Sequence, residues 1–287
     1  MTTKTEAVEN EIDSKSIVLF LGETGSGKTT TIKALLGYKM GKKKYKGMTW
    51  VTIVEEVTDK KVLEMHANPS SKSVTRYLVA VKPKSKITTE DIYLTDTPGW
   101  GDTAGLEVQL ANIIGVRRAL RGCRKVVPVI VISKDSWGNR GKGIRDLGRT
   151  VTSLFQDYEA IKGSVVIIMN RFSKTEMDEM EHKFNNLIEE MESSDRTNNQ
   201  YIAFLEHLRY LAREKELLTF DPLVDNPKEL MNLLIKKPAL TKPSSVFQDS
   251  ILSTTVINTF CTETAKRIKY HLKANTPGMV DYFYRNL

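Results

Sequence analysis

The stretch "LGETGSGKTTT" at residues 21–31 decides the fold of this chain. From Gly22 to Thr29 it fits the pattern G-x-x-x-x-G-K-[ST], with the apolar run "SIVLFL" at 16–21 before it and a helical pattern after it. A glycine-rich turn between a strand and a helix directs backbone N–H groups at a phosphate, and the positive end of the helix adds to the attraction. The sequence therefore predicts a phosphate site in this turn.

Each residue of this phosphate loop has an expected part. Lys28 is expected to bridge the β- and γ-phosphates of a nucleotide, and Thr29 to place its hydroxyl on Mg²⁺. The alternative is a strand-to-helix turn that binds nothing, and the flanking strand and helix weigh against it. The predicted nucleotide-binding residues of the loop are Gly22, Glu23, Thr24, Gly25, Ser26, Gly27, Lys28, Thr29 and Thr30.

Short apolar runs alternate with longer helical patterns along the chain. Continuous apolar strands separated by helices favour a mostly parallel sheet that is covered on both faces. The sequence therefore predicts an α/β fold with three layers, in which helices lie on both faces of a mostly parallel central sheet. The alternating strands near residues 50 and 75 are expected at sheet edges. Strands are expected at 16–21, 48–57, 73–81, 91–96, 125–133, 164–169 and 216–220, and long helices at 175–191 and 244–273.

The chain of 287 residues is long enough to bury a substantial core without disulfides. We expect one domain over residues 16–273, with a flexible segment at 1–15 before it and a tail at 274–287 after it. An insertion near 38–72 is expected, and the segment "MTWVTIVEEVTDKKVLEM" at 48–65 is expected to form an extra hairpin within it. Inside this insertion, "YKMGKKKYKGM" at 38–48 is expected to be a solvated, mobile loop rather than a lipid or nucleic-acid patch, because it lacks interleaved aromatic residues.

The composition favours a cytoplasmic protein. The N-terminus is polar where a secretion signal needs an apolar centre, and the two cysteines, Cys123 and Cys261, show no pairing motif. The formal net charge of +8 permits weak affinity for phosphate-rich surfaces. A peripheral membrane surface is therefore kept open as a partner, whereas nucleic acid is not favoured.

A second motif, "DTPG" at 96–99, follows the buried strand expected at 91–96. Its aspartate, Asp96, can hold Mg²⁺ through a water molecule, and the N–H of Gly99 can donate to a γ-phosphate. The loop after it would then be ordered by a nucleotide triphosphate and released after hydrolysis. This coupling favours a switch GTPase over kinases and transporters that share the phosphate loop.

Three segments together, "GETGSGKTTTIKALLG", "SVT" at 73–75 and "DTPGWGDT", resemble the septin and AIG (GIMAP) branch of the TRAFAC P-loop GTPases. The resemblance covers residues 16–105. It implies a P-loop GTPase domain that binds GTP or GDP with Mg²⁺, hydrolyses GTP and forms homodimers or homo-oligomers. It also implies Thr75 as a threonine that completes the Mg²⁺ shell. The implied catalytic residues are Lys28, Thr75 and Gly99, and the implied metal residues are Thr29, Thr75 and Asp96.

Thr75 has a second interpretation besides Mg²⁺ binding. The stretch between Lys28 and Thr75 is longer than is usual in the resembling families, so this threonine can instead simply pair across strands.

The base-reading motif departs from the pattern of this class. Guanine specificity normally comes from [NT]-K-x-D, and this chain has "NRFS" at 170–173. Asn170, Arg171 and Ser173 are the predicted nucleotide-binding residues of this segment. Asn170 can still meet the purine and the stem of Arg171 can cover its ring, but Ser173 supplies only one weaker acceptor in place of the carboxylate that rejects adenine. GTP is the expected nucleotide, adenine nucleotides remain an alternative, and "NRFS" can also be a plain strand-exit loop.

The position after Gly99 also departs from the pattern. Ras-like enzymes place a water-orienting glutamine there, whereas this chain has Trp100, which cannot accept a proton from water. Slow hydrolysis is therefore expected unless a partner completes the site. Arg140 and Lys142 are candidate residues for acting on a partner's nucleotide, although a solvated basic loop is the simpler interpretation.

Two other functions stay open: an ATP-dependent or mixed-nucleotide phosphotransferase, and a structural subunit that never exchanges its nucleotide.

Overall fold

The structure is a computed structural model that describes residues 2–45, 47–65, 78–99, 116, 120–138, 141–193 and 195–247. The chain divides into two compact units, Met1–Gln248 and Asp249–Leu287, and the second lies outside the described residues. In the described part, no helix has the length and apolar character needed to cross a membrane. The elements are α1 (Thr2–Ile12), β1 (Ser16–Leu21), α2 (Lys28–Leu35), β2 (Met40–Tyr45), β3 (Met48–Ile53), α3 (Lys60–Glu64), β4 (Val79–Val81), β5 (Ile92–Asp96), β6 (Lys125–Ser133), α5 (Lys134–Trp137), α6 (Lys142–Leu154), α7 (Tyr158–Ile161), η2 (Lys162–Ser164), β7 (Val166–Asn170), α8 (Lys174–Asp178), α9 (Met180–Glu189), η3 (Asp195–Thr197), α10 (Asn199–Arg213), α11 (Pro227–Lys236) and α12 (Pro243–Val246).

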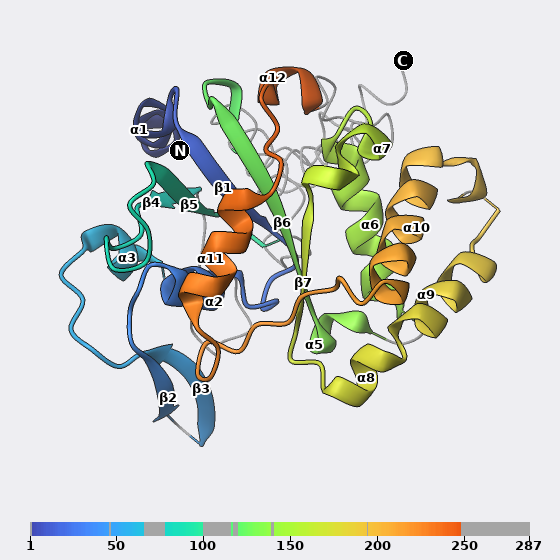
Figure 1. Cartoon of the computed structure of the whole chain (residues 1–287), viewed down its shortest axis with the longest axis horizontal. Helices are drawn as coiled ribbons and strands as arrows, with labels where there is room; N and C mark the ends of the chain where they lie inside the picture. Colours follow the sequence, from blue (N-terminus) through green and yellow to red (C-terminus); the bar gives the residue numbers. More distant parts are fainter. Residues whose placement is uncertain are drawn as a thin grey trace, which may run out of the picture. The chain divides into compact units, whose positions relative to one another are not determined.

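The central sheet has five strands in the order β4-β5-β1-β6-β7 (Figure 1). Strand β4 runs antiparallel to β5 at one edge, and the other four strands are parallel. The predicted α/β fold with a mostly parallel central sheet is therefore confirmed.

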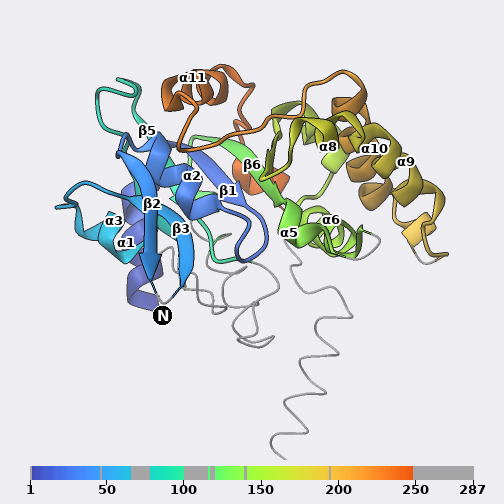
Figure 2. The same ribbon diagram turned by 90° about the horizontal axis from the view of Figure 1, so that it is seen from below.

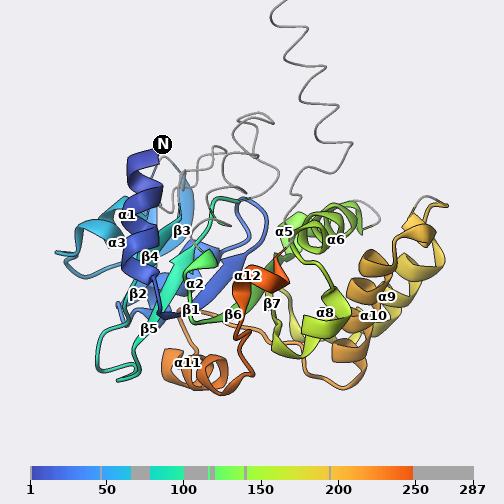
Figure 3. The same cartoon turned by 90° about the horizontal axis from the view of Figure 1, so that it is seen from above.

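Helices cover both faces of this sheet (Figure 3). Along β1, Ile17, Leu19 and Leu21 pack into a cluster with α6, α9 and α10, whereas Val18 and Phe20 pack into a second cluster with α2 and α11. Successive side chains of a strand point to opposite faces, so a strand that is apolar at every position must be covered on both. The three-layer prediction follows from this alternation.

The N-terminal segment differs from the flexible stretch that the sequence leads us to expect. Residues 2–12 form α1, and its last residue, Ile12, is fully buried in the cluster that contains α6 and α10. Burial of one large aliphatic side chain stabilises the fold by about 1.5–3 kcal/mol, which contributes to holding the C-terminal end of α1 in place.

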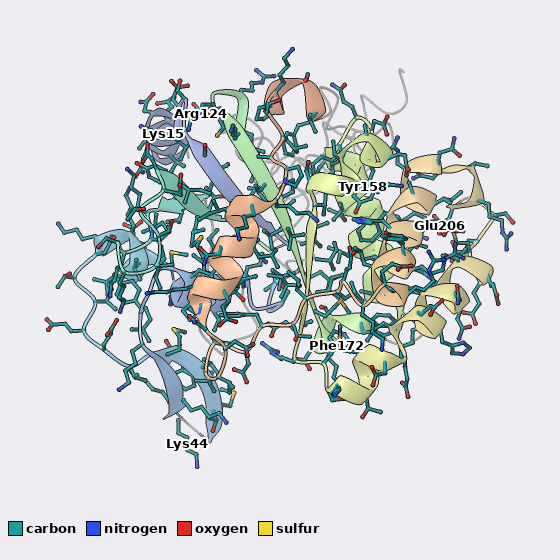
Figure 4. All side chains as sticks on the ribbon, viewed as in Figure 1. Lys15, Lys44, Arg124, Tyr158, Phe172 and Glu206 are labelled. Carbon is teal, nitrogen blue, oxygen red and sulfur yellow. The ribbon has the colours of Figure 1, made fainter. Side chains whose placement is uncertain are left out.

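The lysine-rich stretch at 38–48 is not the mobile loop that the sequence predicts. Its residues 40–45 form β2, which pairs antiparallel with β3 in a separate two-stranded sheet. A hairpin is thus present in the insertion, but only its second strand lies in the predicted segment 48–65, because the lysine-rich β2 is its first strand. Because the register places Lys43 opposite Trp50, an aromatic residue does lie beside the lysines. Lys44 lies at the far end of the hairpin (Figure 4).

The structure changes two other expectations, and a third lies mostly outside the described residues. The segment 216–220 is not a strand, since only Leu218 forms an isolated bridge with Ile168 of β7. The helix expected at 175–191 is divided into α8 and α9. Most of the long helix expected at 244–273, and the boundary at 273, lie outside the described residues.

A buried tyrosine and histidine link α7 to α10 on one side of the sheet. The hydroxyl of Tyr158 lies 2.8 Å from Nδ1 of His207, and both side chains are buried (Figure 4 labels Tyr158). Burial is the largest cause that lowers the pKa of His207 to about 4, and the charges of Lys162 and Lys237 lower it further. His207 is therefore neutral in the folded chain near neutral pH.

This histidine should make the fold sensitive to acid. The unfolded chain takes up a proton at His207 near its ordinary pKa of 6.5, while the folded chain does not until about pH 4. Stability is therefore lost as pH falls from 6.5 towards 4, by about 2 kcal/mol between pH 7.5 and pH 5. Chemical denaturation at both pH values should show that His207→Gln reduces this loss and that His182→Gln, at an exposed position, does not. An equal acid loss in the His207→Gln variant would contradict the assignment.

Candidate nucleotide-binding site

The candidate site lies where the parallel strands end. Strands β1, β6 and β7 lead directly into the phosphate loop, α5 and the loop before α8, and Figure 2 views the molecule from this side. Because carboxyl ends of parallel strands meet at one edge of a sheet, residues distant in sequence are brought together there.

The phosphate loop has the backbone conformation that the motif requires. Gly27, at the start of α2, has φ of +101°, a conformation that other residues rarely adopt. A Cβ atom at this position would lie 2.0 Å from Nδ2 of Asn170, so glycine is required by contact as well. The helix that follows presents its free N–H groups towards the loop.

Lys28 is folded back over this loop. Its Nζ donates to the carbonyl oxygens of Gly22 and Glu23, each at 2.8 Å, and the side chain is buried. Burial lowers the pKa of Lys28 to about 8, while the carboxylates of Asp96 and Glu23 oppose this effect. Among the described residues, the acceptors of this ammonium are carbonyl oxygens, and a buried cation of this kind is suited to receive an anionic phosphate oxygen.

The pKa of Glu23 is raised to about 7, first by burial and then by repulsion from Asp146. This loop carboxyl therefore carries reduced negative charge near neutral pH, which limits its repulsion of a phosphate.

Two residues predicted to hold Mg²⁺ are in direct contact. The hydroxyl of Thr29 donates to Oδ2 of Asp96 at 2.7 Å, and Asp96 is fully buried at the end of β5. The strand end is fixed because Thr97 donates to the carbonyl of Phe20 at 2.6 Å. A hydroxyl and a carboxylate are oxygen donors of the kind that Mg²⁺ prefers. The residues present therefore fit a Mg²⁺ ion, with Thr29 and Asp96 as those that would hold it.

The "DTPG" loop touches the phosphate loop. A Cβ atom at Gly99 would lie 2.4 Å from Oγ1, 2.5 Å from Cα and 2.6 Å from the backbone nitrogen of Thr24. Buried oxygens Oγ1 of Thr24 and Oγ of Ser26 have no hydrogen-bond partner within the described part of the chain. Buried hydroxyls without partners are costly, and a bound phosphate could accept from them.

The "NRFS" segment fastens the exit of β7 to the phosphate loop. Nδ2 of Asn170 donates to the carbonyl of Ser26 at 2.8 Å, and a guanidinium nitrogen of Arg171 donates to the carbonyl of Gly25 at 3.2 Å. Arg171 has φ of +65°, which is uncommon outside glycine, and it pairs with Asp135 of α5. This geometry favours a functional motif over a plain strand-exit loop.

Ser173 has a task that sequence reasoning did not assign. It caps α8 in a capping box, in which its hydroxyl accepts from the N–H of Glu176 and the carboxylate of Glu176 accepts from the N–H of Ser173. The carboxylate also pairs with Lys134 at 2.7 Å. The sequence carried a signal for this cap in the S-x-x-E spacing of Ser173 and Glu176.

Several predicted site residues cannot be located. Thr75, Trp100 and Arg140 lie outside the described residues. Lys142 is exposed at the first turn of α6. The structure thus brings together the phosphate loop, Asp96, Gly99, Asn170 and Arg171, and leaves the roles of Thr75 and Arg140 as predictions.

Comparison with known proteins gives one family match and several similar solved structures. A family model described as 50S ribosome-binding GTPase matches residues 17–196. The sequence has no significant match among curated proteins. Among solved structures, a dimerization-deficient mutant of Toc33 from Arabidopsis thaliana is 14% identical, with a TM-score of 0.42, and the match covers 85% of this chain and 95% of Toc33. Era from Aquifex aeolicus bound to GDP·AlF4⁻ is 15% identical, with a TM-score of 0.38, and the match covers 82% of this chain and 62% of Era.

The family match spans more than half of the chain and contains every element of the site just described, from β1 and the phosphate loop through Asp96 to Asn170. The chain therefore belongs to the family described as 50S ribosome-binding GTPase, within the TRAFAC P-loop GTPases.

Proposed function

We propose that this chain is a Mg²⁺-dependent switch that binds GTP and GDP and hydrolyses GTP slowly when alone. The observation that carries the proposal is the contact between two loops distant in sequence, at Gly99 and Thr24. A γ-phosphate bound in the phosphate loop would lie against this contact, so its loss on hydrolysis would release the "DTPG" loop.

Different residues of the site would bind different parts of the nucleotide. Lys28 would exchange its two carbonyl acceptors for phosphate oxygens, and the N–H groups at the start of α2 would donate to the same group. Asn170 and Arg171 keep the base-reading segment fastened to the phosphate loop. Mg²⁺, when bound, would neutralise charge on the phosphates near Thr29 and Asp96.

Partner assembly is the second part of the proposal. Trp100 in place of a glutamine supports slow turnover, since indole cannot accept from a water molecule. The resemblance to septin and AIG GTPases supports a second copy of the chain as the partner that completes the site. A cytoplasmic location is proposed from the polar N-terminus and the absence of a cysteine pairing motif, and a peripheral membrane surface from the net charge of +8. The alternatives are a mixed-nucleotide phosphotransferase and a subunit that never exchanges its nucleotide.

Thermal unfolding of the full chain with Mg²⁺ and GTP, GDP or ATP tests the binding part. We expect GTP and GDP at a hundred times their Kd to stabilise the fold by about 2.7 kcal/mol, because they bind only the folded state. ATP should stabilise less, and EDTA should weaken the effect of GTP. A second readout, GTP turnover per molecule, should lie well below about ten per second and rise with protein concentration.

Each result separates one alternative. Equal stabilisation by ATP and GTP would favour the phosphotransferase, and nucleotide that never exchanges would favour the structural subunit. Turnover per molecule that does not depend on concentration would contradict assembly, and no stabilisation by any nucleotide would contradict the switch.

A further inference from the structure

Recognition of guanine has a chemical requirement that Ser173 cannot meet. The N1–H and the 2-amino group of guanine are both donors, so a carboxylate is the acceptor that fits them. Adenine presents no such pair of donors, and a site built around this carboxylate rejects it strongly. The hydroxyl of Ser173 is moreover engaged in the cap of α8.

A carboxylate nevertheless lies beside Ser173. Oε2 of Glu176 accepts from the backbone nitrogen of Ser173 at 2.9 Å and from its hydroxyl at 2.8 Å. Oε1 of the same group accepts from Nζ of Lys134 at 2.7 Å. The contacts of Lys134 and Ser173 lower the pKa of Glu176 to about 2, so the group is ionised at every pH at which the protein would work.

The segment that carries this carboxylate is fixed relative to the phosphate loop. Asn170 and Arg171, which lie six and five residues before Glu176, donate to the carbonyls of Ser26 and Gly25. Between them, the ring of Phe172 packs edge to face on Trp137 of α5, with centroids 6.2 Å apart (Figure 4 labels Phe172). A base that extends from the phosphate loop along Arg171 would thus reach the start of α8.

We propose that Glu176 supplies the carboxylate that reads the N1–H and 2-amino group of guanine, three residues after the position at which this class normally carries an aspartate. This inference rests on the proposed GTP-binding function and names the residue that would give it base specificity.

Both oxygens of the Glu176 carboxylate can become available to accept hydrogen bonds from a base. Lys134 is half-exposed, and exposed ion pairs contribute little, so its ammonium can leave Oε1 at small cost when guanine arrives. The hydroxyl of Ser173 can rotate away from Oε2, while the backbone N–H of Ser173 still holds the carboxylate in place.

Glu176→Gln separates base reading from helix capping, because glutamine also serves at this position of a capping box. The glutamine side chain can accept from the N1–H of guanine, but its NH₂ group faces the 2-amino group of guanine, which is also a donor. Xanthine has a carbonyl oxygen at position 2, and this oxygen can accept from the NH₂ group. With Mg²⁺ present, the variant should bind GTP about tenfold or more weakly than the parent and XTP more tightly. Glu179→Gln, an exposed glutamate one turn further, should change neither affinity.

Equilibrium binding of GTP, XTP and ATP to the parent chain and both variants gives distinct outcomes. A GTP/XTP ratio that is the same in the parent and in Glu176→Gln would overturn the role of Glu176 and leave GTP binding intact. A parent chain that binds no nucleotide would overturn the proposed function, and the role of Glu176 with it. A reversed preference for XTP in Glu176→Gln alone would support the inference.

Discussion

Replacing Lys28 by methionine is expected to remove most of the affinity for GTP while the fold stays intact. The ammonium is the buried cation of the phosphate loop, and its acceptors in the absence of nucleotide are two carbonyls of that loop. Removing one partner of a buried charge pair costs about 2–5 kcal/mol. This corresponds to a loss of about thirtyfold to several-thousandfold in affinity.

In the absence of nucleotide, the same Lys28→Met change should stabilise the fold. Burial holds the pKa of Lys28 at about 8, below the ordinary value of 10.5, so the folded chain binds fewer protons than the unfolded chain between these values. The cost of burying the charge is fully present below pH 8 and is relieved as pH rises towards 10.5. Near pH 7, Lys28→Met should therefore raise the free energy of unfolding by about 1–3 kcal/mol.

Denaturation and nucleotide titration of the same samples measure both effects. Lys174→Met, at an exposed lysine of α8, is the matched control and should change neither quantity. If Lys28→Met bound GTP as tightly as the parent, residues 22–29 would not be a phosphate loop. If it lost GTP affinity only because it unfolded, the buried charge would not have the cost assigned to it.

The layers of the fold follow from the sequence because strands β1 and β6 are apolar at successive positions. Such strands must be covered on both faces, and β6 has the bounds 125–133 that the sequence predicts. The hairpin strand β2 could not be predicted in this way. Its lysines are exposed, and only pairing with β3 makes it a strand. Residues 216–220 have a strand-like composition, yet a single residue, Leu218, pairs with the sheet.

Part of the candidate site can also be predicted from the sequence, and part cannot. The approach of Asp96 and Asn170 to the phosphate loop follows from topology, since the carboxyl ends of parallel strands share one edge. The contacts of Glu176 could not be deduced from strand order, because they depend on how one helix is capped and on Lys134 of a neighbouring helix.

Replacing Gly99 by alanine is expected to abolish the link between the "DTPG" loop and the phosphate loop. The added methyl group would lie within 2.6 Å of Oγ1, Cα and the nitrogen of Thr24, and two of these are backbone atoms that cannot turn aside. One loop must therefore shift relative to the other. Because a misplacement of about 1 Å can cost about a hundredfold in rate, GTP hydrolysis should fall by about that factor.

The matched control for this change is Gly163→Ala in η2. A Cβ atom there meets no heavy atom within 4 Å, so the same addition of a methyl group should leave hydrolysis and nucleotide affinity unchanged. In Gly99→Ala, GDP should bind nearly as in the parent, because the γ-phosphate is the group that the N–H of Gly99 would contact. The decisive comparison is the ratio of GTP to GDP affinity, measured together with turnover. An unchanged ratio with unchanged turnover would show that the "DTPG" loop does not sense the γ-phosphate, even if Lys28 still holds it.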